Sequence, residues 1–260
     1  MDLHLRGKVA LVTGASRGIG RAIAEGLAAE GCNLLLTGRD EAALAETAAA
    51  IAKLGGKSHT HAVDLRREDA APALVAAAKA AFGRLDILVN NAGTTKRGDF
   101  LTQPDSDWQE GFALKFFAHV RTARAFWPLL RESRGSIVAI TGTAGAQPTA
   151  NSIIGGSVNA ACNVFNEALA QLGTEAGVQV VVISPGHVDT ARLQGRLDVL
   201  IKERGLDQTS VREHYRKTLG ANRLGLPQDV AGLVAFVVSP HGSWLHGTRV
   251  DLHGGQIHPI

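Results

Sequence analysis

The sequence is poor in tyrosine and cysteine, and it contains no long apolar run. One tyrosine, Tyr215, and two cysteines, Cys32 and Cys162, occur among its 260 residues. The cysteines form no CxxC pair and no metal-binding spacing, so we interpret both as small core residues in a reducing compartment. No apolar stretch approaches the length of about 18 residues that a membrane helix needs. A membrane protein is therefore not expected.

Charge is nearly balanced and is dispersed along the chain. The formal net charge is +3, and charged residues make up 20% of the sequence. Because lysine and arginine form no block, nucleic acid is not an expected partner. Residues 1–8 contain no apolar core, so no signal peptide is predicted and a cytoplasmic location is expected. No metal site is predicted, because no known metal-ligand spacing fits the C-terminal histidines His241, His246, His253 and His258.

Short apolar runs alternate with longer helical patterns along the chain. The expected strands cover 8–13, 33–37, 58–64, 86–90, 136–141, 178–184 and 248–252. The clearest helical patterns cover 106–132, about 157–174 and 228–239. This alternation predicts parallel strands joined by right-handed crossovers, with helices on both faces. The fold class is therefore α/β: a single Rossmann-like domain over 1–260, with a doubly wound parallel sheet of about seven strands.

A glycine-rich loop follows the first expected strand and opens a helix. Its sequence, TGASRGIG (13–20), places Gly14, Gly18 and Gly20 where the backbone turns tightly and approaches a ligand closely. The helix N-terminus offers free N–H groups and the positive end of its dipole to a diphosphate. No Gly-Lys-Ser/Thr follows, so the loop is not a P-loop. The pattern predicts a dinucleotide site, and a glycine-rich turn kept for packing is the alternative.

Two arginines lie where the adenosine ribose would bind. Arg39, in TGRD at the end of the second expected strand, occupies a position where an acidic residue would bind the ribose hydroxyls. Arg17 lies in the glycine-rich loop itself. Two guanidinium groups suit a 2′-phosphate, so NADP(H) is favoured over NAD(H). The alternative is that Arg39 is a solvated side chain without a ligand.

Together with LVNNAG (88–93), the glycine-rich loop resembles the short-chain dehydrogenase/reductase family. Further resemblances lie at VDL (63–65), DWQEGFALK (107–115), SPGHVDT (184–190), RLGLPQDVAGLVAFVVS (223–239) and GTRVDLHGG (247–255). The resemblance covers the chain from about 6 to 255. It implies cofactor contacts from Gly14, Ser16, Arg17, Gly18, Ile19, Gly20, Arg39, Asp64, Leu65, Asn90, Ala92, Gly93, Asn159, Pro185, Gly186, Val188 and Thr190. For Asn90 and its neighbour Asn91, bracing of strands is the alternative.

The catalytic Asn, Ser, Tyr and Lys of that family are missing from their expected positions. Alignment back from SPG needs no gap and places Gly155 at the Tyr position and Asn159 at the Lys position. Gly142 stands at the Ser position and Lys115 at the Asn position. A positioned general acid contributes about 10²–10⁴-fold to a rate. Orientation of bound reactants supplies about 7–11 kcal/mol without it, so the losses slow hydride transfer but do not forbid it.

Three residues are candidates for a replacement proton donor. Lys115 has space beside two glycines, and desolvation would lower its pKa. His187 lies in the segment that closes over the nicotinamide and titrates near neutral pH. Tyr215 lies in the polar, partly helical segment at about 190–226, which we interpret as a substrate loop or lid. The structural alternatives are a surface position for Lys115, a role in the pocket wall for His187 and packing within its own loop for Tyr215.

These observations favour an NADP(H)-dependent oxidoreductase that acts on a carbonyl or alcohol small molecule through an atypical proton-donor site. Thr141 and Thr143 are candidates to replace the lost hydroxyl, with backbone bonding as the alternative. A second hypothesis is a retired enzyme that binds a dinucleotide as a sensor or assembly partner, because both Tyr and Lys are lost. A cofactor-free lyase or hydrolase is a third, against which the glycine-rich loop argues. The resemblance also implies a homodimer or homotetramer formed through the helices at 106–132 and 157–174.

Overall fold

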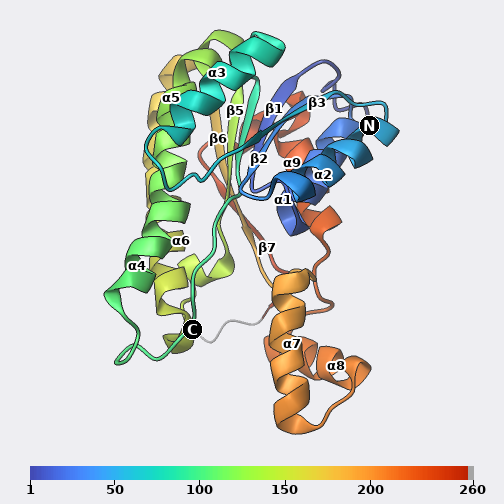
Figure 1. The fold of residues 1–260 in the computed structure, drawn as a ribbon, viewed down its shortest axis with the longest axis vertical. Coiled ribbons are helices and arrows are strands. Elements are labelled where there is room, and N and C mark those ends of the chain that lie inside the picture. Colours follow the sequence, from blue (N-terminus) through green and yellow to red (C-terminus); the bar gives the residue numbers. More distant parts are fainter. Residues whose placement is uncertain (257–260) are drawn as a thin grey trace.

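The computed structural model describes residues 1–256 and contains a seven-stranded sheet (Figure 1). Neighbouring strands are parallel throughout, in the order β3-β2-β1-β4-β5-β6-β7. The strands are β1 (Val9–Thr13), β2 (Asn33–Gly38), β3 (Ser58–Ala62), β4 (Ile87–Asn90), β5 (Ser136–Ile140), β6 (Gln179–Pro185) and β7 (Arg249–Leu252). The predicted α/β class and the number of strands are confirmed.

Burial of the strands follows their position in the sheet. Every residue of β1, β4 and β5, in the middle of the sheet, is buried. This explains their continuous apolar sequences, because helices cover both faces of a parallel sheet. The edge strands β3 and β7 alternate between exposed and partly buried residues and contain no fully buried one. Their more polar sequences therefore fit the two edges.

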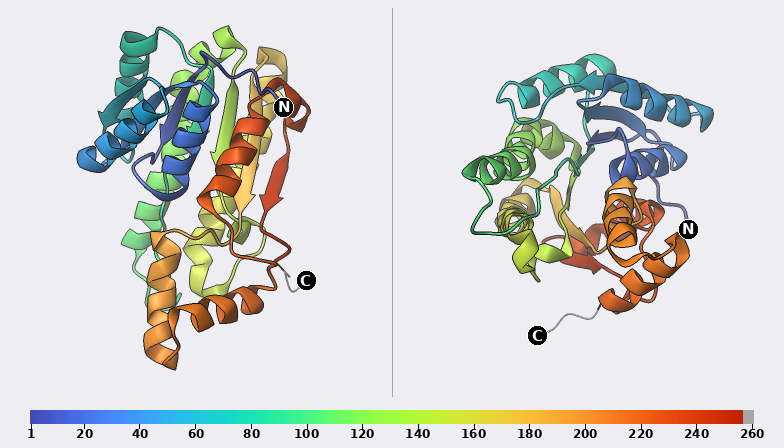
Figure 2. Two further views of the ribbon diagram at one scale, coloured as in Figure 1. Left: turned by 90° about the vertical axis from the view of Figure 1, so that its right-hand side faces the viewer. Right: turned by 60° about the horizontal axis from the view of Figure 1, so that its bottom comes forward.

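Two helical layers enclose the sheet (Figure 2). One apolar core joins the sheet to α1 (Gly18–Ala29), α2 (Glu41–Lys53) and α9 (Pro227–Val237). A second core on the opposite face involves α3 (Ala70–Phe82), α5 (Ala118–Ser133) and α6 (Ile153–Ala176). The two cores together hold the strand ends, and the loops that follow them, in fixed positions.

The long helical pattern predicted at 106–132 is divided into three parts. It begins as α4 (Asp105–Gly111), widens into a π-helical turn at Phe112–Phe117 and continues as α5. A π-helical turn shifts the register of the side chains that follow it, and such turns are frequent at functional sites. Lys115 lies within this turn. The neighbouring α6 begins at Ile153, four residues before the predicted start at 157.

The segment at 190–226 forms two helices beyond the carboxyl ends of the strands (Figure 1). These are α7 (Ala191–Arg204) and α8 (Gln208–Leu219). They share a small apolar cluster formed by Leu193, Leu197 and Val211, against which Tyr215 packs. A parallel bridge between Val188 and Gly225 joins the two ends of this segment. The α7–α8 segment is therefore a separate small layer beside the main cores.

Short helical turns complete the described chain at Thr143–Gly145, Ala150–Ser152 and Pro240–Leu245. Within residues 1–256, no helix combines the length and the apolar character needed to cross a membrane. The same part of the chain contains no cluster of three or more His, Cys, Asp or Glu side chains placed to hold a metal. His258, one of the histidines considered above, lies outside the described residues.

Candidate active site

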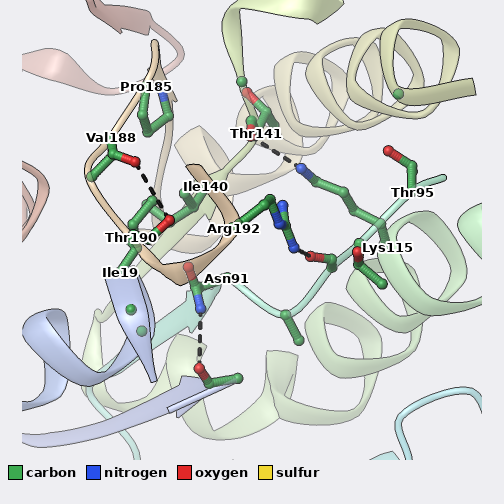
Figure 3. A pocket seen from close by; sticks show the side chains of 18 of the residues that line it. Ile19, Asn91, Thr95, Lys115, Ile140, Thr141, Pro185, Val188, Thr190 and Arg192 are labelled. Carbon is green, nitrogen blue, oxygen red and sulfur yellow. Dashed lines mark hydrogen bonds between the residues drawn. The ribbon is translucent and has the colours of Figure 1, made fainter. Parts of the chain in front are cut away.

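A cavity of about 670 Å³ opens at the carboxyl ends of the strands (Figure 3). The strand order reverses between β1 and β4, and ligands of open α/β sheets bind at such a switch point. Gly38, Ile140 and Pro185, from the ends of β2, β5 and β6, line the cavity. The loops after β1, β3, β4, β5 and β6, the π-helical turn, and the starts of α6 and α7 form the remaining walls.

The glycine-rich loop after β1 is packed closely against the loop after β4. Gly14 has a φ of 67°, a left-handed conformation that glycine adopts without strain. A Cβ added to Gly20 would collide with the Gly14 carbonyl oxygen. The Asn91 amide donates to the Thr13 carbonyl oxygen at 2.9 Å, which braces the two loops. The close packing of the two loops leaves room for a diphosphate at the start of α1. The residues present therefore fit a dinucleotide.

Most of the residues for which the sequence suggested a cofactor contact are brought together in this cavity. They are Gly14, Ser16, Arg17, Gly18, Ile19, Gly20, Arg39, Leu65, Ala92, Gly93, Asn159, Pro185, Gly186, Val188 and Thr190. Asn90 and Asp64 do not line it. Asn90 is buried and its Oδ1 accepts from Thr122 Oγ1 at 2.8 Å, whereas Asp64 pairs with the Arg66 guanidinium. The asparagine that reaches the cavity is Asn91.

Arg17 and Arg39 provide positive charge where the loop after β1 meets the end of β2. Both side chains are exposed, and neither forms an ion pair with any residue of 1–256. Arg39 follows Gly38, the last residue of β2, and Arg17 precedes α1. Two unpaired guanidinium groups beside a glycine-rich loop suit a phosphate monoester.

Lys115 extends from the π-helical turn into the cavity (Figure 3). Its Nζ donates to the Thr141 carbonyl oxygen at 3.0 Å. Burial lowers the pKa of this amine from its ordinary value of 10.5 to about 8. Its aliphatic carbons occupy the space beside Gly93, where a Cβ would clash with them. The sequence alternative of a surface position is wrong, because the side chain lies inside the pocket.

Gly142, Gly155 and Asn159 all line the cavity, and the sequence alignment assigned them to the Ser, Tyr and Lys positions of the family. A Cβ on Gly155 would lie 3.0 Å from both Ser152 Oγ and Thr95 Oγ1, so two hydroxyl groups flank this position. A Cβ on Gly142 would lie 3.2 Å from Asn159 Nδ2. The Asn159 Oδ1 atom is buried, and it has no hydrogen-bond partner among residues 1–256. Polar side-chain atoms thus lie beside both glycines.

The other two proton-donor candidates are placed differently from Lys115. His187 lines the cavity, and its Nδ1 accepts from the Gln256 amide nitrogen at 2.8 Å. Desolvation, and then the charges of Arg196 and Arg97, lowers the pKa of His187 to about 4, so the expectation that it titrates near neutral pH is wrong. Tyr215 does not line the cavity; its ring packs edge-on against His187 at 5.4 Å between centroids.

The structure also brings residues into the site that the sequence did not indicate. Thr95, Arg97, Ser152, Arg192 and Arg196 all line the cavity. The Arg192 guanidinium, at the start of α7, donates to the Gly93 carbonyl oxygen at 2.9 Å and so spans the pocket (Figure 3). Arg192 and Arg196 share one face of α7. Their spacing of four residues in the sequence could have indicated this, because residues four apart lie on the same face of a helix. No local pattern pointed to Arg97.

Comparisons with known proteins agree with this architecture. The family model described as short chain dehydrogenase matches residues 8–199. The short-chain reductase protein NovJ of Streptomyces niveus is 35% identical over 250 residues, covering 95% of this chain and 93% of the relative. The chain therefore belongs to the short-chain dehydrogenase/reductase family.

Solved structures extend the likeness over the whole fold. L-Sorbose reductase from Gluconobacter frateurii, in complex with NADPH and L-sorbose, superposes with a TM-score of 0.94 at 31% identity and full coverage of both chains. A 7α-hydroxysteroid dehydrogenase in complex with NADH and 7-oxo glycochenodeoxycholic acid gives 0.89 at 28% identity, covering 100% of this chain and 98% of the other. Both nicotinamide cofactors thus occur among similar structures.

Proposed function

We propose that this protein is an NADP(H)-dependent oxidoreductase that interconverts a carbonyl compound and its alcohol, with Lys115 as the proton donor. The observation that carries the proposal is the position of Lys115, whose Nζ lies in the pocket 3.0 Å from the Thr141 carbonyl oxygen. NADPH, when bound, supplies the hydride, which goes to the carbonyl carbon. The proton for the carbonyl oxygen must then come from the protein or from water.

The Lys115 amine is suited to deliver that proton. With a pKa of about 8, it is largely protonated at neutral pH and is a stronger acid than an ordinary lysine. One of its three N–H groups bonds Thr141, which holds the amine in place and leaves two N–H groups for the substrate oxygen or a bridging water. In the reverse direction the neutral amine accepts the alcohol proton.

Other polar side chains around the pocket would orient the reactants. Thr95 Oγ1 and Ser152 Oγ flank the Gly155 position, where they are able to donate hydrogen bonds to the substrate oxygen. Asn159 presents a buried amide whose Oδ1 is unpartnered within residues 1–256, which suits a ribose hydroxyl. Arg17 and Arg39 would bind a 2′-phosphate, and this is the basis for proposing NADP(H) over NAD(H).

The first experiment is a titration of the purified protein with NADPH and, in parallel, with NADH. We expect tighter binding of NADPH. A panel of aldehydes and ketones is then screened for steady oxidation of NADPH. Tight binding without turnover of any panel member would favour the retired, cofactor-sensing protein instead. Failure to bind either cofactor would contradict the proposed function.

We also propose that the α7–α8 segment acts as a lid and that the protein assembles as a homodimer or homotetramer. The outer surface of the π-helical turn and α6 carries exposed Phe117, Val164 and Leu172, whose exposed fractions are 47%, 66% and 60%. Pairing of these faces between copies would remove that apolar surface from water. Light scattering on the wild-type protein and Val164→Glu tests the assembly, and a monomeric wild type would contradict it.

A further inference from the structure

Arg97 and Arg196 line the pocket without a carboxylate partner in residues 1–256. Arg97 lies in the loop between β4 and α4, and Arg196 lies on α7. Two other cations of the surrounding segments have carboxylate partners. Lys96 binds Asp107 at 2.6 Å, and Arg212 of the lid binds Asp189 at 2.6 Å. Like Arg17, Arg39 and Arg192, the two arginines therefore line the cavity without forming a salt bridge within residues 1–256.

The two guanidinium groups are close enough to influence each other and the adjacent wall. Desolvation, followed by the charge of Arg196, lowers the pKa of Arg97. Both charges also disfavour protonation of His187. No Asp or Glu is found among the described residues that line the cavity. Two like charges held together in this way are relieved when an anion binds between them.

The remaining cations of the pocket have other positions and contacts. Arg17 and Arg39 lie by the glycine-rich loop and the end of β2, and Lys115 is bonded to Thr141. Arg192 donates to the Gly93 carbonyl oxygen. Arg97 and Arg196 are left, and their charges act on His187, which lines the same cavity.

We propose that Arg97 and Arg196 form an oxyanion subsite that binds a carboxylate or phosphate group carried by the small-molecule carbonyl substrate. This inference rests on the proposed oxidoreductase function and names the substrate class of the same pocket. Guanidinium groups recognise both oxyanions through paired N–H donors. The uncharged His187 ring and the Tyr215 ring behind it would form the wall against which the carbon chain of the substrate lies.

The test compares pairs of substrates in which only one member carries an anionic group. Straight-chain oxo acids of increasing length are each paired with their methyl ester, and dihydroxyacetone phosphate is paired with dihydroxyacetone. With saturating NADPH, we expect the charged member of at least one pair to have a KM about tenfold to hundredfold lower than its neutral partner. A preference in the oxo-acid arm identifies a carboxylate, and one in the other arm identifies a phosphate. Equal KM values within every pair that is turned over would overturn the proposal.

Variants assign the preference to the two arginines. Arg97→Gln and Arg196→Gln are expected to raise KM for the charged substrate about tenfold or more, with KM for the neutral partner nearly unchanged. Lys202→Gln, on α7 but outside the pocket lining, is the matched control. Thermal unfolding of each variant with NADP⁺ verifies that the fold and the cofactor site persist. An undiminished charge preference in both variants would contradict the assignment.

Binding without turnover separates this inference from the proposed function. The protein saturated with NADP⁺ is titrated with the same charged and neutral compounds, and with inorganic phosphate, at constant ionic strength, and its melting temperature is followed. Stabilisation by an oxyanion that is lost in Arg97→Gln would support the subsite even if no NADPH oxidation were found. No stabilisation by any oxyanion, together with no charge-dependent turnover, would overturn it.

Discussion

At the phosphate-loop end of the pocket, glycines allow backbone segments to touch, whereas at the catalytic end they leave space between side chains. Gly20 has no room for a Cβ, because the Gly14 carbonyl oxygen occupies that position. Gly155 lies beside two hydroxyl groups, and small movements of these side chains would make room for an added Cβ. The same residue type therefore has different roles at the two ends.

This difference separates the cofactor-binding end of the pocket from the end that holds the proposed proton donor. The phosphate end retains the packing that a dinucleotide requires. At the catalytic end, the Lys115 amine lies in the pocket, and its side chain extends from the π-helical turn past Gly93.

The largest effect is expected from Lys115→Met, which keeps the side-chain volume but removes the proton donor. Turnover should fall about 10²–10⁴-fold, because a positioned general acid is removed. NADPH affinity should change little, because Lys115 lies outside the phosphate loop. Stopped-flow and steady-state kinetics measure the turnover, and a fluorescence titration measures the NADPH affinity. Lys79→Met, on the exposed side of α3, is the control, and an unchanged turnover number in Lys115→Met would rule out this role.

The pH dependence of the reaction rate and of stability tests the role of Lys115 independently. The pKa of Lys115 is lowered to about 8, so carbonyl reduction by the wild type should decline as pH rises through that value. The folded protein also binds fewer protons here than the unfolded chain between about pH 8 and 10.5, so this group's contribution to stability increases with pH across that window. Lys115→Met should lack both dependences. Rate profiles and denaturant titrations at several pH values would reveal them.

Gly20→Ala should weaken NADPH binding about tenfold to hundredfold, because the loop must shift to admit the methyl group. The control is Gly232→Ala on α9, where an added Cβ meets nothing within 4 Å. That change should leave binding intact and stabilise the fold by about 0.4–1 kcal/mol. Calorimetric titration and thermal unfolding of both variants separate lost binding from lost folding. Equal NADPH affinity in Gly20→Ala and wild type would show that the close backbone approach is unnecessary.

A smaller effect is expected at the 2′-phosphate. Arg39→Ser should lower NADPH affinity about tenfold and leave NADH affinity nearly unchanged, because one charge-assisted contact is removed. Arg131→Ser, an exposed position on α5, is the control. Parallel titrations with the two cofactors measure the preference. A similar loss for both cofactors would assign Arg39 to a contact that the two share.

The sequence predicted the sheet well, because continuous apolar runs reflect burial between two helical layers. The glycine-rich loop was predicted equally well, because the residues that form it are adjacent in the sequence. The assignment of Asn90 to the cofactor illustrates a limit. Successive side chains at the end of a strand point to opposite sides, so Asn90 turns toward Thr122 while Asn91 reaches the cavity.

The rest of the site depends on tertiary structure. The alignment placed Lys115 at the Asn position, but its inward direction follows from a π-helical turn that the helical pattern at 106–132 did not reveal. Arg97 and Arg196 come from distant segments, and only the docking of α7 beside the loop after β4 unites them. The low pKa of His187 depends first on its burial and then on those same charges, which explains why its ordinary titration range was a misleading guide.

The smallest change is expected from Gly155→Ala, which tests the contrast between the two ends directly. The new Cβ would lie 3.0 Å from Ser152 Oγ and Thr95 Oγ1, and both hydroxyls are able to rotate away. The higher helix propensity of alanine, worth about 1 kcal/mol, offsets part of this crowding. We expect an NADPH affinity within about twofold of wild type and a free energy of unfolding within about 1 kcal/mol. A loss of NADPH binding as large as that of Gly20→Ala, measured by the same titration, would mean that glycines at both ends serve close packing.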